Sequence, residues 1–518
     1  MDGFQPDVIV VGAGSAGCAL ARRLIDAGEM RVLLLEAGGP DDNPAIHDPA
    51  RFHELWHAAE DWDYQTVAQP HAAGRELHWP RGRVLGGSSC LNGLIHVRGA
   101  RVDFDGWVAA GAQGWGWDDV LPVYRGMEDF DAGESQLHGA GGPLSVLSRY
   151  PLAPVHEAII AAAGELGIER NPDYNSGELD GISQQQLTIR DGRRDSAAAA
   201  YLRPVLDAPA LRVMTGAHAH RLLLDGDACV GVEWEREGRI ESARAACEVV
   251  VCAGAIGSPR LLLLSGIGPA DELRALGIEV VADLSGVGRN LHDHLLSPAV
   301  FAAQRAIAPP APGLSPIQTH LWWRSRPGLP APDTQPIHFS VPLYEPWMEG
   351  PENGFTLLGG LVAPASRGAI RLSGPDPEDP LLIDPRILCE PQDLDALVAS
   401  LAQVRELGVA AALRDEWGAR ELYPGPEVRS EVQLRDYVRR TAISYHHQVG
   451  TCRMGGDPDA VVDPQLRVHG IAGLRVADAS VMPTVTSGNT NAPTLMIGER
   501  AAGFVAARSS AATSVAAG

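Results

Sequence analysis

Two adjacent histidines, His446 and His447, lie in the polar, glycine-rich segment Ser444–Gly455. Histidine has a pKa near neutrality and can act as a general base, and a segment of this composition favours a loop at a site over a core helix. Alcohol oxidation is one chemistry that needs such a base, because a hydroxyl proton must be removed while a hydride leaves carbon. By residue type alone either histidine could be this base, and both could equally be surface or structural histidines.

A second polar segment, Gly488-Asn489-Thr490-Asn491, lies closer to the C-terminus. A side-chain amide can donate a hydrogen bond to a substrate oxygen and stabilise the charge that develops there. The same run can be a turn or a helix cap, because asparagine is common in both. Asn489 and Asn491 are therefore both candidates for a group that assists the base.

The N-terminal segment predicts the element that would place a nucleotide beside these groups. Its parts are an apolar run at Asp7–Val11, the turn Gly12-Ala-Gly14-Ser-Ala-Gly17, a helical pattern at Cys18–Ala27, and a second strand at Arg31–Leu35 that ends in Glu36. In such a βαβ unit the first glycine makes the tight turn, the second admits a pyrophosphate and the third lets helix and strand pack closely. The acid can accept hydrogen bonds from a ribose, and the phosphates lie at the helix N-terminus. By itself the unit allows an NAD(P) enzyme as well as a flavoenzyme.

The composition excludes several function classes. All 42 basic side chains are Arg, so the chain can form neither a pyridoxal-phosphate Schiff base nor a P-loop with its lysine. A formal charge of −23 disfavours nucleic acid and anionic membranes as partners, and no apolar run approaches the ~20 residues of a membrane span. Seven scattered cysteines without a C-x-x-C pair indicate reduced thiols, so we expect a cytoplasmic protein.

Two other kinds of site find little support in the sequence. His292-Asp293-His294 alternates as in a strand and offers two ligands on one face, but no neighbouring cluster completes the four ligands of structural zinc. We therefore expect no metal site. The motif Gly-x-Ser-x-Gly is absent, which leaves an α/β-hydrolase without its nucleophile.

Later segments predict further strands and a second domain. Leu211–Trp234 indicates hairpin strands around Asp225-Gly226, and Val249–Cys252 indicates a buried strand. A region rich in Pro and Ala, residues 302–333, follows. Beyond it, strands are predicted at Ile337–Leu343 and Phe355–Pro364, and helices at Gln392–Leu407 and Glu431–Thr441.

Six ordered groups of segments resemble the glucose–methanol–choline (GMC) oxidoreductases, a family of FAD-dependent alcohol oxidases and dehydrogenases. They are Asp7–Gly17 with Leu33–Gly38; Gly82–Asn92 with Val97–Gly99; Ala253–Leu264 with Ser265–Pro269; Gly286–His294; His447–Gly455; and Leu474–Pro483 through Gly488–Pro493. They span nearly the whole chain, and only residues 302–441 match weakly.

The resemblance implies an α/β (α+β) fold, with a Rossmann-like FAD-binding domain of the GMC type and a discontinuous substrate-binding domain that contains an antiparallel sheet. The FAD-binding domain is expected at residues 1–150, 201–300 and 442–518, and the substrate-binding domain at residues 151–200 and 301–441. The resemblance also implies that His447 is the base and Asn489 its partner, with Asn491 as the competing choice. His446 is then expected to be a pocket wall.

The cofactor that the resemblance implies is FAD. Its expected contacts are Gly12, Ala13, Gly14, Ser15, Gly17, Glu36, Ala37, Val84, Gly87, Asn92, Gly93, Leu94, Ile95, Ala219, Asp478, Ala479, Asn489 and Thr490. Some family members tether FAD covalently to a histidine at the position of Leu91, and leucine cannot form that bond. We therefore expect non-covalent FAD, and we interpret the neighbouring Cys90 as an inert, buried thiol.

The implied function is oxidation of a primary alcohol to the aldehyde, by proton abstraction and hydride transfer to flavin N5, with oxygen or another acceptor taking the electrons. Aromatic residues in the weakly matching region favour an aromatic or heteroaromatic alcohol; they are Trp322, Trp323, Phe339, Tyr344 and Trp347. The alternatives are a flavin-containing lyase of the hydroxynitrile-lyase type on the same scaffold, and a flavin-binding protein without catalysis.

Overall fold

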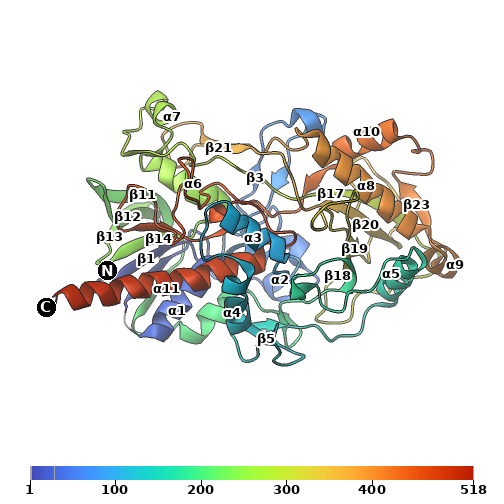
Figure 1. Ribbon diagram of the computed structural model, residues 1–518, viewed down its shortest axis with the longest axis horizontal. Helices are drawn as coiled ribbons and strands as arrows, with labels where there is room; N and C mark the ends of the chain where they lie inside the picture. Colours follow the sequence, from blue (N-terminus) through green and yellow to red (C-terminus); the bar gives the residue numbers. More distant parts are fainter. Residues whose placement is uncertain (1–2, 29, 517–518) are drawn as a thin grey trace.

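The computed structural model describes residues 3–28 and 30–516 of this chain. The molecule is elongated, with a parallel sheet toward one end and an antiparallel sheet toward the other (Figure 1). Segments that are far apart in the sequence contribute to each sheet.

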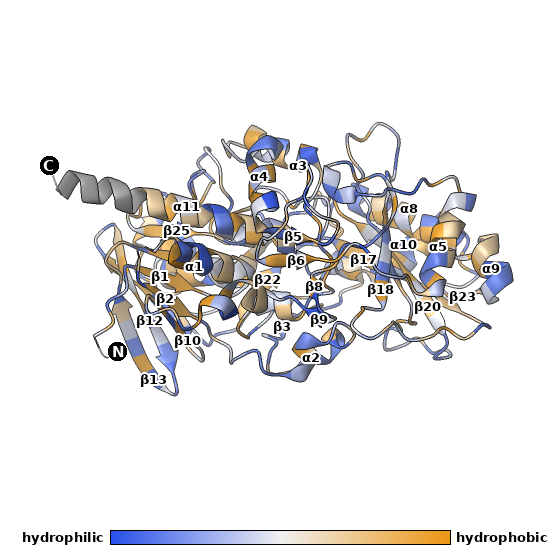
Figure 2. Ribbon diagram, turned by 90° about the horizontal axis from the view of Figure 1, so that it is seen from below, coloured by the Kyte–Doolittle hydropathy of each residue, from blue (hydrophilic) through white to orange (hydrophobic). Residues whose placement is uncertain are grey.

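The parallel sheet has five strands in the order β10-β2-β1-β14-β25. They are β1 (Val8–Val11), β2 (Val32–Leu35), β10 (Leu211–Met214), β14 (Glu248–Val251) and β25 (Leu474–Val476), and every neighbouring pair is parallel. The central strands β1, β2 and β14 are buried along their whole length, and the orange colour of β1 and β2 in Figure 2 marks their residues as hydrophobic. A parallel sheet of this kind has both faces covered by other elements.

Helix α1 (Ser15–Ala27) follows β1 and packs against the long C-terminal helix α11 (Asn491–Ala516), which runs beside it in Figure 1. A glycine makes the close approach possible. A Cβ atom on Gly498 would lie 2.3 Å from the carbonyl oxygen of Ala16. The last helix of the chain therefore packs directly onto the first.

The predicted βαβ order is confirmed, although α1 begins at Ser15 and not at Cys18. One prediction was wrong. Residues 211–214 form β10, which pairs in parallel with β2 and does not belong to the hairpin. The hairpin consists of β11 (His218–Asp225) and β12 (Ala228–Arg236), and β13 (Arg239–Arg244) extends it. Strand propensity marks a strand but leaves its partner open.

The second sheet is antiparallel, with the strand order β23-β17-β20-β19-β18-β7, and β24 also pairs with β17. Its strands are β7 (Gly181–Gln184), β17 (Leu295–Ala302), β18 (Ile317–Trp322), β19 (Ile337–Phe339), β20 (Gly354–Leu361), β23 (Arg420–Tyr423) and β24 (Ile443–Ser444). Strand β18 was not predicted, and it lies in the region rich in Pro and Ala. The expected limits between the two domains were residues 300/301 and 441/442. Strand β17 extends across the first limit, and β24 lies just after the second, although both belong to the antiparallel sheet. The domain limits stay a prediction.

Helix α8 (Pro391–Gly408) covers this sheet by packing on β20 and β17. The helices predicted from periodicity are confirmed here, since α10 is found at Glu431–Thr441 and α8 exceeds its predicted bounds by one residue at each end. No single helix in residues 3–28 and 30–516 is long and apolar enough to cross a membrane. The bent pair of α8 and α9 (Ala411–Trp417), at 46°, reaches that length and composition only when taken together.

The remaining helices and strands are shorter or connect the two sheets. The helices are α2 (Pro44–His47), α3 (Arg101–Ala109), α4 (Trp117–Met127), α5 (Pro154–Glu165), α6 (Gly254–Leu264) and α7 (Ala270–Ala275). The strand pairs are β3 (Tyr64–Gln65) with β4 (His78–Trp79), β5 (Glu128–Phe130) with β6 (Leu144–Val146), β8 (Ile189–Arg190) with β9 (Arg193–Arg194), β15 (Ile267–Gly268) with β16 (Ala282–Asp283), and β21 (Ala369–Leu372) with β22 (Leu381–Asp384).

Candidate active site

A cavity of about 830 Å³ lies where the carboxyl ends of the parallel strands face the antiparallel sheet. Segments that follow β1, β2, β14 and β25 line one end, and residues of β17, β19 and β20 line the other. Its volume is within the ~300–1,000 Å³ typical of ligand sites. Its position is the one at which open α/β sheets bind ligands. We refer to the two ends as the nucleotide end and the substrate end.

Glycines bring backbone against backbone at the nucleotide end. Gly12 turns the chain after β1 with a φ of +101°, and a Cβ there would lie 2.5 Å from the carbonyl oxygen of Cys252. A Cβ on Gly17 would lie 1.9 Å from the carbonyl oxygen of Gly12, so glycine is required for α1 to pack on the strand. Gly87 approaches Gly14 so closely that its Cβ would lie 2.7 Å from the Gly14 Cα. The two glycine segments together form one backbone surface, which lines the cavity.

The N-terminus of α1 opens onto this glycine surface. No described side chain caps the helix at Gly14, and its first turn holds no acidic residue. The free N–H groups and the helix dipole therefore favour an anion such as a pyrophosphate. A Cβ on Gly14 would meet only Gly87, at 3.9 Å, so the space beside it is open toward the cavity. This donor set and this open surface fit a dinucleotide.

Glu36 ends β2 beside the same surface. One carboxylate oxygen accepts a hydrogen bond from the N–H of Ala13 and the other from the N–H of Gly38, both at 2.9 Å. Burial raises the pKa of Glu36 to about 7. Each oxygen keeps a further lone pair, so the side chain can accept from ribose hydroxyls, as expected from the motif.

Most of the predicted cofactor contacts line the cavity. These are Gly12, Gly14, Ser15, Glu36, Ala37, Gly87, Asn92, Gly93, Ile95, Ala219, Asp478, Ala479, Asn489 and Thr490. Ala13, Gly17, Val84 and Leu94 do not line it. Ala13 and Gly17 shape the turn behind the glycine surface, while Val84 and Leu94 are buried in neighbouring apolar clusters.

Arg194 is a residue that the sequence analysis missed. Its guanidinium donates to the side-chain oxygen of Asn92 at 2.6 Å and to the carbonyl oxygens of Ser89 and Ile46 at 3.2 and 2.7 Å. Burial lowers its pKa to about 10. Arg194 therefore fixes the loop that carries Asn92, which lines the cavity. Nothing in the local sequence separates it from its exposed neighbour Arg193.

His447 and Asn489 meet on the wall of the cavity. Asn489 Nδ2 lies 3.2 Å from His447 Nε2, and both residues line the cavity. The pKa of His447 lies well below its ordinary value, because only 7% of the residue is exposed and because His294, His446 and Arg81 oppose a further positive charge. The imidazole is therefore neutral at pH 7 and able to accept a proton.

The competing choices make other contacts. Asn491 Oδ1 accepts a hydrogen bond from the Ser15 hydroxyl at 2.8 Å, at the start of α11. His446 lines the cavity with its ring packed edge-on against Trp56, at 5.2 Å between ring centroids. These contacts fit a helix-end residue and a pocket wall. The histidine and the asparagine that the structure brings together are therefore His447 and Asn489.

The motif that was weighed for metal binding instead supports His447. Asp293 accepts a hydrogen bond from the backbone N–H of His447 at 2.7 Å, and His294 Nδ1 lies 2.9 Å from His447 Nδ1. His292 does not share this cluster, because its Nε2 accepts from the N–H of Val485 at 2.9 Å. The sequence analysis missed the roles of Asp293 and His294, since nothing local links them to a base so distant in the chain.

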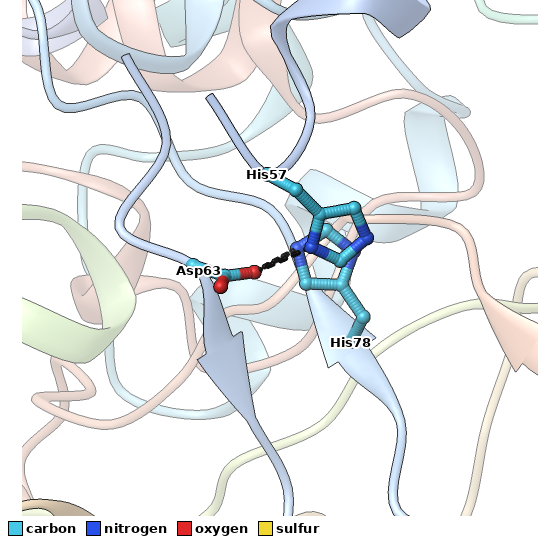
Figure 3. A group of neighbouring side chains, drawn as sticks. All are labelled: His57, Asp63 and His78. Carbon is cyan, nitrogen blue, oxygen red and sulfur yellow. Dashed lines mark hydrogen bonds and ion pairs between the residues drawn. The ribbon is translucent and has the colours of Figure 1, made fainter. Parts of the chain in front are cut away.

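Among residues 3–28 and 30–516, two other groups of side chains lie close enough together to be considered as metal ligands. At the first, Asp63 Oδ1 lies 2.7 Å from His57 Nδ1 and 3.0 Å from His78 Nε2 (Figure 3). The two rings are stacked, with centroids 3.8 Å apart. Imidazole lone pairs lie in the ring plane, so stacked rings do not direct both nitrogens at one ion at the ~2.0–2.1 Å that zinc requires. The geometry fits two hydrogen bonds to one carboxylate.

The second group consists of His218, His220 and Glu378, and its first member lines the cavity. The guanidinium of Arg260 lies 3.0 Å from His218 Nε2. This cation opposes a metal ion beside the same ring. Neither group supports metal binding, and the expected lack of a metal site stays a prediction.

Comparison with known proteins supports the resemblance to the GMC oxidoreductases. The GMC oxidoreductase family models match residues 6–296 and 364–498. An oxygen-dependent choline dehydrogenase of Brucella melitensis is 36% identical, over 98% of this chain and 96% of the relative. An uncharacterised GMC-type oxidoreductase of Mycobacterium bovis is 39% identical, over 97% and 99%.

Solved structures extend the similarity to the whole fold. The crystal structure of pyridoxine 4-oxidase from Mesorbium loti has a TM-score of 0.91 and 39% identity, covering 96% of this chain and 98% of that one. A formate oxidase of Aspergillus oryzae has a TM-score of 0.90 and 26% identity, covering 98% and 99%.

The glycine surface generates a prediction with a matched pair of variants. Gly14→Ala places a methyl group in open space, so we expect a melting temperature near that of the wild type but a several-fold loss of bound flavin. Gly17→Ala forces a Cβ against a carbonyl oxygen, and overpacking of this kind costs about 1–3 kcal/mol or more. Flavin content by absorbance and melting of the apoproteins separate the two effects. Full flavin occupancy in Gly14→Ala would contradict a cofactor contact there.

Proposed function

Because the chain belongs to the GMC oxidoreductase family, whose members are FAD-dependent and act on CH–OH donors, we propose that it oxidises a neutral aromatic or heteroaromatic primary alcohol to the aldehyde. The observation that carries this proposal is the contact between His447 and Asn489 in the cavity that also holds the glycine surface. The named relatives are oxidoreductases, and no contact in the described residues favours the lyase alternative.

In this proposal His447 and Asn489 both contact the substrate hydroxyl, one as proton acceptor and the other as hydrogen-bond donor. FAD, bound along the glycine surface, supplies the hydride acceptor. His447 Nε2 takes the hydroxyl proton, and burial keeps the imidazole neutral, and so able to accept a proton, at neutral pH. Asn489 Nδ2 donates a hydrogen bond to the same oxygen as negative charge develops on it. Abstraction of the proton by a positioned base is typically worth ~10²–10⁴-fold in rate.

We propose that FAD is held without a covalent bond. Leu91 lines the cavity at the position expected for a tether, and its side chain has no atom that could form one. Cys90 lies outside the cavity lining, and its thiol contacts the carbonyl oxygen of Leu85. Burial raises the pKa of Cys90 to about 12, so it is not a reactive thiolate.

The charge of the cavity argues for a neutral substrate. Among the described residues that line it, the carboxylates are Glu36 and Asp478, and both lie at the nucleotide end. Asp478 already accepts from the N–H of Gly254 and the hydroxyl of Ser258. A quaternary ammonium such as that of choline would find no carboxylate at the substrate end, and only the faces of the aromatic side chains there could offset its loss of hydration.

The substrate end is apolar and aromatic. Its lining includes Phe52, Trp56, Ile95, Leu296, Ile317, Ile337, Phe339, Leu358 and Tyr445. Of the five aromatic residues emphasised in the sequence analysis, only Phe339 is part of it. Trp322 is a core residue that donates its indole N–H to the carbonyl oxygen of Ser487, and Trp347 is 49% exposed. The aromatic character therefore comes mainly from other residues than those expected, and it supports a flat substrate.

Three further expectations stay predictions: the domain assignment, the choice between oxygen and another electron acceptor, and a cytoplasmic location. Cys18, Cys90, Cys229, Cys252, Cys389 and Cys452 are free thiols in the structure, as expected from the sequence.

The mode of cofactor binding can be tested directly. We expect acid or heat to precipitate the polypeptide and leave yellow FAD in the supernatant, because Leu91 cannot tether it. Absorbance of the two fractions measures the outcome. Flavin that stays with the washed precipitate would contradict the proposal.

The substrate class is tested by anaerobic mixing of the holoenzyme with alcohols of matched size. We expect benzyl alcohol or a hydroxymethylpyridine to bleach the flavin and choline to leave it oxidised, since the substrate end offers no carboxylate. A lyase would leave the colour intact with every alcohol. Bleaching by choline at the lowest concentration of the panel would overturn the charge argument.

The role of His447 predicts both a rate and a pH effect. His447→Ala should slow anaerobic flavin reduction by about 10²–10⁴-fold. His446→Ala should lose far less, and Asn489→Ala should fall in between. Because burial holds the pKa of His447 well below its ordinary value, the wild-type rate should be flat near neutral pH and fall only in acid, where the imidazole gains its proton. The acid limb should vanish in His447→Ala. An inactive His446→Ala with an active His447→Ala would reverse the assignment.

A further inference from the structure

We infer that Gln335, acting through Asn489, holds His447 in the tautomer whose Nε2 carries no proton, and that His294 accepts a hydrogen bond from His447 Nδ1 in this state. Both are positioning residues, because they act on His447 directly or through Asn489. The inference rests on the proposed function, since it takes His447 as the base.

The chain consists of three contacts between the buried side chains of Gln335, His447 and His294 and the half-buried side chain of Asn489. Gln335 Nε2 donates to Asn489 Oδ1 at 3.1 Å, and Asn489 Nδ2 lies 3.2 Å from His447 Nε2. On the other side of the ring, His447 Nδ1 lies 2.9 Å from His294 Nδ1. A neutral imidazole carries its single proton on one nitrogen, so each contact in the chain constrains the next.

His294 offers a matching partner on the other side of the ring. One of the two facing Nδ1 atoms must donate to the other, and when His447 carries its proton on Nδ1, His294 Nδ1 accepts it. His447 Nε2 is then left with its lone pair.

The direction of the chain is set at Gln335. The amide nitrogen of Gln335 faces Asn489 Oδ1 with one hydrogen and lies 3.4 Å from His320 Nδ1. An NH₂ group only donates, so Asn489 must present its own NH₂ group to His447. That arrangement requires a lone pair on His447 Nε2. The tautomer selected in this way is the one that can accept the hydroxyl proton.

The backbone holds Gln335 in place for this role. Its N–H donates to the carbonyl oxygen of Gly360 at 3.1 Å, which ties the segment before β19 to β20. A Cβ on Gly360 would lie 2.2 Å from the carbonyl oxygen of Gln335, so a glycine permits the approach. The titratable group that faces the Gln335 amide is His320, which burial keeps neutral. Those around His447 are His294, His446, Arg81, Asp293 and Tyr445.

The test replaces Gln335 by glutamate, which has the same shape but reverses the direction of the hydrogen bond to Asn489 when it is ionised. In Gln335→Glu an ionised carboxylate only accepts, so the Asn489 amide should turn and present Oδ1 to His447, which moves the ring proton to Nε2. A protonated carboxyl can still donate. We therefore expect flavin reduction near the wild-type rate at low pH and a loss of about tenfold or more as the carboxyl ionises. This alkaline limb should be absent from the wild type and should affect kcat more than KM.

Gln335→Met is the matched control, because it removes the donor without reversing the chain. We expect a uniform decrease in rate with no new pH limb. Selective ¹⁵N labelling of histidine reads the tautomer in the wild-type holoenzyme without any substitution, and His447, assigned by comparison with His447→Ala, should be protonated on Nδ1. A proton on Nε2 would overturn the inference, as would a Gln335→Glu profile that parallels the wild type. Undiminished activity in His447→Ala would instead refute the proposed function.

Discussion

The hydrogen bond from the His447 backbone N–H to Asp293 joins the two loops on which the site depends. Asp293 lies just before β17, and His447 lies just after β24, which pairs with β17. The base is thus held by the antiparallel sheet. Asn489 and the glycine surface belong to segments that pack on the parallel sheet. Chemistry at the hydroxyl requires both, so the site exists only where the two sheets meet.

The sequence predicted the parts of the site whose physics is local. The βαβ turn could be recognised because strand, glycines, helix and acid follow one another within a single unit, and Gly17 packs against the carbonyl oxygen of Gly12 inside it. His447 and Asn489 came from a family resemblance, since residue types alone left two histidines and two asparagines open. Asp293, Arg194 and Gln335 were missed, because their partners lie 154, 102 and 154 residues away in sequence.

The misplaced elements have a common cause. A short apolar strand is recognised by its composition, but its partner is chosen by packing that local pattern does not contain. Residues 211–214 were therefore assigned to a hairpin when they complete the parallel sheet. Trp322 shows the same limit, because a buried aromatic in a core and one in a cavity wall share the same sequence signal. Only the fold separated them.

The packing of α11 on α1 and of β25 on β14 sets the order in which the protein can mature. The central strands and the first helix are made early, but Asp478, Asn489 and Thr490, which line the cavity, arrive with the last segment of the chain. During synthesis the nascent protein holds an unfinished sheet edge and a half-open nucleotide end. A chain without β25 and α11 would lack these lining residues and would expose the unpaired edge of β14, and an unpaired edge is a template for pairing with another chain.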